Sequence, residues 1–169
     1  MTTEYLMRRE MEHVFAALTP ANRLVCQVAV HTGLRVGDVL AIPTAKLGRQ
    51  FWVTERKTGK RKRVNLPQTL VDDIRAQAGP VWAFPGARSP DKPRTRQAVW
   101  ADVKRAAKAF RMPQNVGVHS LRKRYAVEQL ERSKGNFKRV QALLNHADMA
   151  TTMIYAMSYQ LYLAKYAKT

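Results

Sequence analysis

Residues 146–155 read His146-Ala-Asp-Met-Ala-Thr-Thr-Met-Ile-Tyr155 and carry more information about fold and function than any other stretch of the chain. Asp148 is a typical N-cap residue, so the stretch predicts a histidine in a loop followed directly by the start of a helix. Tyr155 stands nine positions after His146, beyond that helix start. The stretch therefore brings an imidazole and a phenol together in sequence, in a chain that also holds many cationic side chains.

The chain is strongly basic. Its 169 residues include 30 Lys and Arg against 12 Asp and Glu, which gives a formal net charge of +18 at pH 7. Such an excess of one sign destabilises a compact chain through self-repulsion unless a polyanion offsets it. Because neutralising phosphates releases condensed counterions, we expect a nucleic acid as the partner.

Length and composition predict one globular domain over residues 1–169. Hydrophobic residues make up 46% and charged residues 25% of the chain, which is typical of a folded, soluble protein. No apolar run reaches the length of a membrane span, and the N-terminal sequence does not resemble a secretion signal, so we expect a cytoplasmic protein without a membrane partner. Cys26 is the only cysteine, which excludes an internal disulfide and a thiolate metal cluster.

Hydrophobic periodicity predicts that most of the chain is helical. Pro20 suits the first turn of a helix and Gly33 suits its C-cap, so Arg35 should follow a sharp turn. A short helix is expected after that turn, over residues 36–40. An earlier helix is predicted from apolar residues that recur at three-to-four spacing: Leu6, Met7, Met11, Val14, Phe15 and Leu18. Further helices are predicted over residues 68–78, from Thr95 onward, and over 119–131, 137–145 and 157–167.

Residues 49–66 interrupt the helical pattern. Gln50–Thr54 and Arg63–Leu66 read as two strands around a turn at residues 57–60. Six of the eight residues from Arg56 to Arg63 are basic. The predicted fold is therefore mainly α with one small antiparallel β-hairpin, and the hairpin carries a dense positive charge.

His119 and Arg122 are three positions apart, so on a helix they project from one face. Taken alone, they could be a capping histidine and a surface arginine. Lys123 and Arg124 extend this positive cluster and suit contact with phosphates in either case. His146, taken alone, could equally be a structural or solvated loop residue.

Tyr155 has an ordinary structural interpretation as well. Tyr155, Tyr159, Tyr162 and Tyr166 recur at spacings of four, three and four, which predicts an aromatic stripe along one helix. A tyrosine hydroxyl is also a poor nucleophile unless positive groups stabilise its anion. Spacing alone would make Tyr155 the first core aromatic of that stripe.

Arg35 and Lys57 are also open to modest interpretations. Arg35 stands three positions before Asp38, so a local ion pair is possible. Lys57 lies at the tip of the predicted hairpin, where it could be one more nonspecific phosphate contact. Each of these signals is weak by itself.

The order of these residues is similar to that in the catalytic domain of the tyrosine recombinases, the phage integrase family. That pattern has an arginine in a Thr-Gly-Leu-Arg turn with an acidic residue three positions later, a hairpin lysine, His-x-x-Arg, a second histidine, and a tyrosine nine positions beyond it. The residues of this chain that match the pattern are Arg35 with Asp38, Lys57, His119 with Arg122, His146 and Tyr155.

The resemblance implies roles for these residues in metal-free cleavage of DNA. Tyr155 would attack the scissile phosphate and form a 3′-phosphotyrosine. Arg35 and Arg122 would hold the non-bridging oxygens, and Lys57 would protonate the departing 5′-oxygen. The remaining matches would assist: His119 would accept the tyrosine proton, His146 would hydrogen-bond the phosphate, and Asp38 would orient the region around Arg35.

The resemblance also implies partners. Double-stranded DNA would be bound by four subunits on paired sites, without a metal ion or other cofactor. Residues 156–169 could be exchanged between subunits, or could fold back on their own domain. Further DNA contacts are expected from basic residues of the hairpin and of the His119 helix: Arg56, Lys60, Arg61, Lys62, Arg63, Lys123 and Arg124.

The chain departs from the family pattern in three ways. Asn145 stands where the family often has glycine before the second histidine, and Lys123 stands where histidine is frequent after the arginine. We expect that the chain lacks the N-terminal DNA-clamping domain that most relatives carry, either as an excised catalytic fragment or as a naturally minimal recombinase. Two other functions stay open at this stage, a DNA-binding accessory or repressor domain without catalysis and a type IB topoisomerase-like relaxation of DNA.

Overall fold

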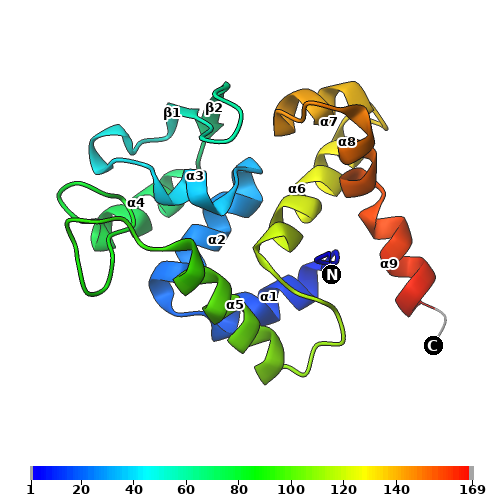
Figure 1. The fold of residues 1–169 in the computed structure, drawn as a ribbon, viewed down its shortest axis with the longest axis horizontal. Helices are drawn as coiled ribbons and strands as arrows, with labels where there is room; N and C mark the ends of the chain where they lie inside the picture. The colour runs from blue at the N-terminus through cyan, green and yellow to red at the C-terminus, as the bar shows by residue number, and fades with distance from the viewer. Residues whose placement is uncertain (1, 168–169) are drawn as a thin grey trace.

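In the computed structural model, which describes residues 2–167, helices make up most of the fold and the sheet in this part of the chain is a two-stranded antiparallel hairpin (Figure 1). The prediction of a mainly α fold with a small hairpin is confirmed. The helices are α1 (Arg8–Ala17), α2 (Pro20–Thr32), α3 (Val36–Leu40), α4 (Gln68–Gln77), α5 (Arg96–Ala109), α6 (Val118–Arg132), α7 (Phe137–Leu144), α8 (Met149–Ala156) and α9 (Ser158–Tyr166), with a 3₁₀ turn η1 (Thr44–Lys46) and the strands β1 (Gln50–Thr54) and β2 (Arg61–Asn65).

Helix α2 lies at the centre of the fold and packs against α3, α4, α5 and α6. Val25, Val28 and Ala29 face this core and are almost fully buried. Gly33 ends the helix in the left-handed region, with φ of 68°, and the Tyr125 ring would lie 2.4 Å from a Cβ at this position. Only glycine meets both demands, so the predicted sharp turn before Arg35 is built into the sequence.

The hairpin forms where the alternation of residues predicts it, although β2 begins two residues earlier than expected. Gln50 pairs with Asn65 and Thr54 pairs with Arg61, so the register is symmetrical about the turn. Phe51 and Val64 are paired and buried, and they hold one face of the hairpin on the core. The opposite face and the turn at its tip remain open to solvent.

The first helix starts later than predicted. Leu6 and Met7 precede α1, which begins at Arg8, because the Glu10 carboxylate accepts a hydrogen bond of 2.7 Å from the Met7 backbone N–H and so caps the helix there. Leu6 is nevertheless buried in the core from an extended segment. The apolar spacing therefore predicts which residues face the core, but it places the start of the helix too early.

The tyrosine stripe is split between two helices, which corrects the prediction of one continuous helix. Asp148 caps α8 as predicted, accepting a bond of 2.7 Å from the Thr151 N–H. Met157 then separates α8 from α9, and the Ser158 hydroxyl bonds the Tyr155 carbonyl at 2.6 Å across the junction. Tyr155 therefore belongs to a different helix from the other tyrosines of the stripe.

Helix α9 folds back on the N-terminal segment of its own chain (Figure 1). The Tyr5 ring packs against Tyr159 and Tyr162 at centroid distances of 5.4 and 5.8 Å. The Tyr162 hydroxyl donates to Glu10 at 2.7 Å, and Lys165 pairs with Glu4 at 2.5 Å. The structure thus shows the folded-back arrangement for residues 158–166, while positions 168 and 169 of the predicted exchange segment lie outside the described residues.

Apolar packing divides the molecule unevenly. One large cluster joins α1 to α5, the hairpin and the start of α6. A second, small cluster consists of Tyr125, Ala126, Val140 and Leu144, and Tyr155 packs against it. Within residues 2–167, none of the helices has the length and hydropathy needed to cross a membrane.

Candidate active site

The C-terminal ends of α2 and α7 meet at the centre of the molecule. Each helix ends in a left-handed residue, Gly33 for α2 and Asn145 for α7, the latter with φ of 51°. The Arg122 guanidinium, which is 2% exposed, donates to the carbonyl oxygens of Gly33 and Leu144. Arg122 therefore joins the turn before Arg35 to the turn before His146.

Lys62 makes a parallel connection between the same helix ends. Its Nζ donates to the carbonyl oxygens of Thr32 and Leu143 at 2.5 Å each and lies 5.1 Å from the Tyr125 ring centroid. Burial, followed by the positive charge of Arg122, lowers the pKa of Lys62 to about 8. The ammonium group of Lys62 therefore points into the protein, and a contact of Lys62 with DNA stays a prediction.

Arg35 forms an ion pair, but not with the expected neighbour. Its Nη1 donates to the Glu55 carboxylate at 2.7 Å. Asp38 instead accepts a bond of 2.9 Å from the Arg56 backbone N–H, at the start of the hairpin turn. Arg35 thus pairs with Glu55 of the hairpin instead of with Asp38. Asp38 holds the backbone of the hairpin turn.

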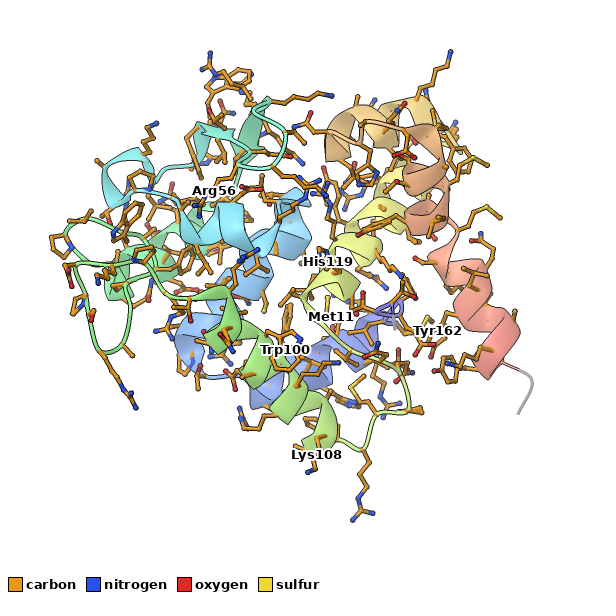
Figure 2. All side chains as sticks on the ribbon, in the orientation of Figure 1. Met11, Arg56, Trp100, Lys108, His119 and Tyr162 are labelled. Carbon is orange, nitrogen blue, oxygen red and sulfur yellow. The ribbon has the colours of Figure 1, made fainter. Side chains whose placement is uncertain are left out.

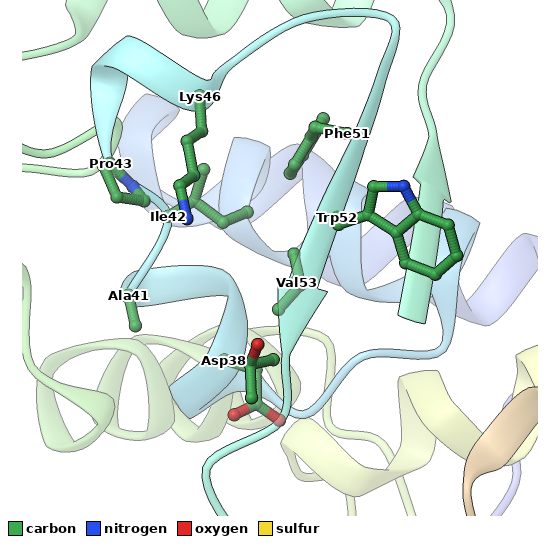
Figure 3. A pocket seen from close by; sticks show the side chains of 9 residues that line it. Asp38, Ala41, Ile42, Pro43, Lys46, Phe51, Trp52 and Val53 are labelled. Carbon is green, nitrogen blue, oxygen red and sulfur yellow. The ribbon is translucent and has the colours of Figure 1, made fainter. Parts of the chain in front are cut away.

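Asp38 also borders a small pocket of about 170 Å³ behind the hairpin (Figure 3). Lys46 stands at the opposite end, and Ile42, Phe51 and Val53 form the walls between them. The pocket is small, and Arg35, Lys57 and His119 line a different groove, so we do not assign it to the site.

Arg35, Lys57 and His119 line one open groove of about 740 Å³ between α3, the hairpin tip and the start of α6. Figure 2 shows His119 near the centre of the molecule, above Trp100 of α5. Three elements that are distant in sequence therefore direct a guanidinium, an ammonium and an imidazole to the same space.

The groove contains residues that were missed in the sequence. Arg96, Gln97 and Trp100 from the first turns of α5 line its far side, and Trp100 is 49% exposed. A large aromatic side chain that stays exposed beside an arginine is a signal for a binding surface. The sequence shows this pair, but it does not show that the start of α5 faces the hairpin.

His146 and Tyr155 are neighbours in space. Their rings pack edge to face at a centroid distance of 5.2 Å, and His146 Nδ1 lies 3.0 Å from the Thr152 hydroxyl. The Lys123 ammonium lies 5.8 Å from the Tyr155 ring centroid. Tyr155 is thus held beside an imidazole and a cation in the last turn of α8.

The concentration of positive charge alters the ionisation of the imidazoles. Burial and the charges of Arg122 and Arg35 lower the pKa of His146 to about 4 and also lower the pKa of His119. Burial and Arg35 lower the pKa of Arg122 to about 10, which leaves it protonated at neutral pH. The site therefore presents cationic arginines beside neutral imidazoles that can accept protons.

Most of the predicted DNA-binding residues of the hairpin are exposed, whereas those on α6 are not free. Lys123 donates to the Thr3 carbonyl, and Arg124 bonds Glu128 at 2.8 Å and the Tyr5 hydroxyl at 2.8 Å. These contacts tie α6 to the N-terminal segment, and DNA contacts at Lys123 and Arg124 stay a prediction. The exposed basic residues of the hairpin are Arg56, Lys57, Lys60, Arg61 and Arg63.

The groups in this arrangement suit the cleavage of a phosphodiester. Arginine groups offer planar donors that match phosphate oxygens, Lys57 can supply a proton, and Tyr155 can supply a hydroxyl. Among the described residues, no group of three or more His, Cys, Asp and Glu side chains is placed to hold a metal ion.

Comparison with known sequences gives a consistent set of relatives. The model of the phage integrase family matches residues 4–161. The tyrosine recombinase XerD of Caulobacter vibrioides is 31% identical, over 89% of this chain and 56% of its own length. The probable integrase/recombinase YoeC of Bacillus subtilis is 26% identical, over 75% of this chain and 71% of its own length. The chain thus spans little more than half of the Caulobacter protein.

Solved structures with the same fold are recombinases as well. A lambda integrase dimer bound to a COC′ core site matches with a TM-score of 0.77 and 21% identity, over 94% of this chain and 49% of the integrase. The XerA recombinase matches with a TM-score of 0.73 and 19% identity, over 96% of this chain and 63% of XerA. At these identities the likeness concerns the fold.

Proposed function

The chain belongs to the phage integrase family, and from this premise we propose that it is the catalytic domain of a tyrosine-type site-specific DNA recombinase. Its reaction would be metal-free cleavage and rejoining of DNA strands through a 3′-phosphotyrosine. The observation that carries the proposal is the convergence of the family's signature residues from distant elements. Arg35, Lys57 and His119 line one groove, and Arg122 connects the turn before Arg35 to the turn before His146.

In the proposed cleavage step the Tyr155 oxygen bonds to phosphorus while the bond from phosphorus to the 5′-oxygen breaks. Arg35 and Arg122 donate to the non-bridging oxygens, where negative charge grows in the transition state. One donor of this kind is worth about 3 kcal/mol, or roughly a hundredfold in rate. Rejoining reverses these bonds with the 5′-hydroxyl of a partner strand, so the energy of the phosphodiester is conserved.

Proton transfer divides between the two sides of the phosphate. We assign His119 as the acceptor of the Tyr155 proton, since its lowered pKa favours the neutral imidazole at neutral pH. Lys57 would give its proton to the departing 5′-oxygen from the exposed hairpin tip. His146 would hydrogen-bond the phosphate through Nε2, because its Nδ1 is engaged by Thr152.

The wider partners are part of the same proposal. Exposed basic residues of the hairpin would contact the backbone of double-stranded DNA, and Arg96 and Trp100 would extend that surface along α5. We further propose a homotetramer on paired sites, acting in the cytoplasm. The alternatives, a silent DNA-binding domain and a type IB topoisomerase-like enzyme, are less favoured, because each position of the family's motif is filled and the relatives are recombinases and integrases.

The test is covalent capture of DNA. The protein is incubated in excess chelator with nicked duplexes from a randomised pool, and adducts that survive denaturing electrophoresis are sequenced. We expect an adduct from the parent protein and none from Tyr155→Phe.

Tyr159→Phe is the matched control, because Tyr159 stands four residues later, in α9, and packs on Tyr5. It should form the adduct at the parent rate. An adduct from Tyr155→Phe would assign the nucleophile elsewhere, and a parent protein without an adduct would favour the binding-only alternative. Relaxation of a supercoiled circle without recombination products would favour the topoisomerase-like alternative.

A further inference from the structure

Glu55 is the least expected charged residue of the interior. Its side chain is 0% exposed, although it lies directly before the exposed turn of the hairpin. A buried carboxylate is costly unless it is paired and hydrogen-bonded. Its partners therefore indicate what the carboxylate is for.

Both oxygens of Glu55 are engaged, by groups from three parts of the chain. Oε2 accepts from Arg35 Nη1 at 2.7 Å and from the Thr58 hydroxyl at 3.3 Å. Oε1 accepts from the Asn145 side-chain amide at 3.0 Å. Each partner is a candidate catalytic residue or the immediate neighbour of one: Arg35 itself, Thr58 beside Lys57, and Asn145 beside His146.

We propose that Glu55 and Asn145 form a positioning link that holds the Arg35 guanidinium, the hairpin tip and the His146 turn in one arrangement around the scissile phosphate. The inference rests on the proposed function, because it assigns the link to the same site. Neither residue touches the reacting atoms in this scheme. Both act through the groups that do.

The backbone explains how Asn145 takes part. It ends α7 in the left-handed region, with φ of 51°, where glycine and asparagine are the most readily accepted residues. Glycine would make the same turn but would offer Glu55 no hydrogen bond. Asparagine makes the turn and also ties it to the hairpin 90 positions earlier in the sequence.

The geometry of the link gives it a distinctive mutational signature. Asn145→Asp places two carboxylates against each other, which repels the His146 turn from the hairpin. Adding Glu55→Gln to that variant restores a donor and an acceptor, since the amide introduced at position 55 can donate to the carboxylate introduced at position 145. On the parent background Glu55→Gln weakens the charge-assisted bond to Arg35 instead.

The experiment measures the rate of adduct formation for the parent, both single variants and the double variant, on the DNA captured with the parent protein. We expect Glu55→Gln and Asn145→Asp to lower the rate about tenfold each, or about 1.4 kcal/mol in activation free energy. In the Asn145→Asp background, however, Glu55→Gln should raise the rate at least threefold. DNA affinity should stay level or increase with Glu55→Gln, because a negative charge is removed from a basic site.

Glu128→Gln is the control for loss of an acidic partner, since Glu128 pairs with Arg124 away from the groove. It should leave the rate unchanged. Urea unfolding of the parent, the two single variants and the double variant tests the link without DNA. Glu55→Gln should lower the midpoint of the parent protein and raise the midpoint of Asn145→Asp. Rates that fall further in the double variant than in either single one, or an unchanged rate for Glu55→Gln, would overturn the inference.

The two proposals fail in different ways. In the first case the parent protein forms no adduct, but Glu55→Gln lowers the urea midpoint of the parent and raises that of Asn145→Asp. This result would remove the proposed function and the catalytic role of the link, and would leave a structural contact. In the second case the parent protein is active, and the effects of the two substitutions on the midpoint and on the rate simply add in the double variant. This result would remove the link and leave the proposed function intact.

Discussion

The two halves of the candidate site are held in place by different forces. Arg35 and His119 are carried by elements that belong to the large apolar cluster around α2. His146 and Tyr155 are carried by α7 and α8, whose own cluster has four buried members. These two helices pack on α6 through that small cluster. They are joined to the end of α2 and to the hairpin by the hydrogen bonds of Arg122, Lys62 and Asn145.

The difference teaches that stability and alignment are separable in this protein. Apolar burial is non-directional, so it can fix the α2 half without fine control of side-chain direction. Hydrogen bonds to carbonyl oxygens are directional, and buried ones are costly to leave unmade. The position of the half that bears Tyr155, relative to α2 and the hairpin, therefore depends on directional bonds more than on buried area.

The largest effect is expected for Arg122→Gln. Adduct formation should fall at least a hundredfold through loss of the proposed phosphate donor. The free energy of unfolding should also fall by about 2 kcal/mol, because the carbonyls of Gly33 and Leu144 lose their shared donor. Amide hydrogen exchange should show increased opening of α7 and α8.

Arg105→Gln supplies the comparison, since Arg105 also bonds a helix carbonyl, that of Ala17, but is 56% exposed. It should cost less than about 1 kcal/mol and leave the adduct rate unchanged. An equal loss of unfolding free energy in Arg122→Gln and Arg105→Gln would contradict the view that Arg122 joins the two halves of the site.

The contrast between the two clusters is tested by a pair of cavity variants. Leu144→Ala and Ile74→Ala each remove most of a fully buried side chain, the first from the small cluster and the second from the large one. Each should destabilise by about 2–5 kcal/mol. Hydrogen exchange should then rise mainly in α7 and α8 for Leu144→Ala, and throughout the molecule for Ile74→Ala. A uniform rise for both would mean that the halves unfold as one unit.

The smallest effect concerns the charge of Lys62. Its pKa is lowered to about 8 in the folded protein from a reference of 10.5, so the folded state disfavours the ammonium form. The resulting penalty is fully present below pH 8 and is relieved as the pH rises from 8 to about 10.5. Relative to Lys62→Met, the parent protein should therefore gain stability as the pH rises through that window.

The readout is urea unfolding of both proteins at pH 7, 8, 9 and 10. Lys60→Met is the control, because Lys60 is exposed at the hairpin tip and should give a constant difference from the parent protein. A difference between the parent and Lys62→Met that does not change with pH would mean that Lys62 ionises like a solvated lysine.

The fold was largely predictable because local rules agree with it. Pro20 and Gly33 bound α2, Asp148 caps α8, and alternating apolar residues place the hairpin. The exceptions have tertiary causes. The Glu10 carboxylate starts α1 late, and the junction at Met157 divides a stripe whose spacing suits one helix.

The site was predictable as a set of residues but not as a set of contacts. The family pattern supplies the names of the candidate groups, whereas their partners come from segments far apart in sequence. Nothing in the sequence around Glu55 shows that Arg35 and Asn145 would meet there, 20 positions before it and 90 after. Similarly, a run of basic residues does not reveal that Lys62 turns inward while Arg61 and Arg63 turn outward.

The edge-to-face packing of His146 on Tyr155 has a spectroscopic consequence. An aromatic ring shifts the magnetic resonance of protons held near it, and these rings lie at a centroid distance of 5.2 Å with an interplanar angle of 73°. The ring protons of the two residues should therefore resonate away from their positions in a flexible peptide. A tyrosine that turns from the imidazole toward a phosphate would lose that displacement, so the two rings report the moment at which the proposed nucleophile moves.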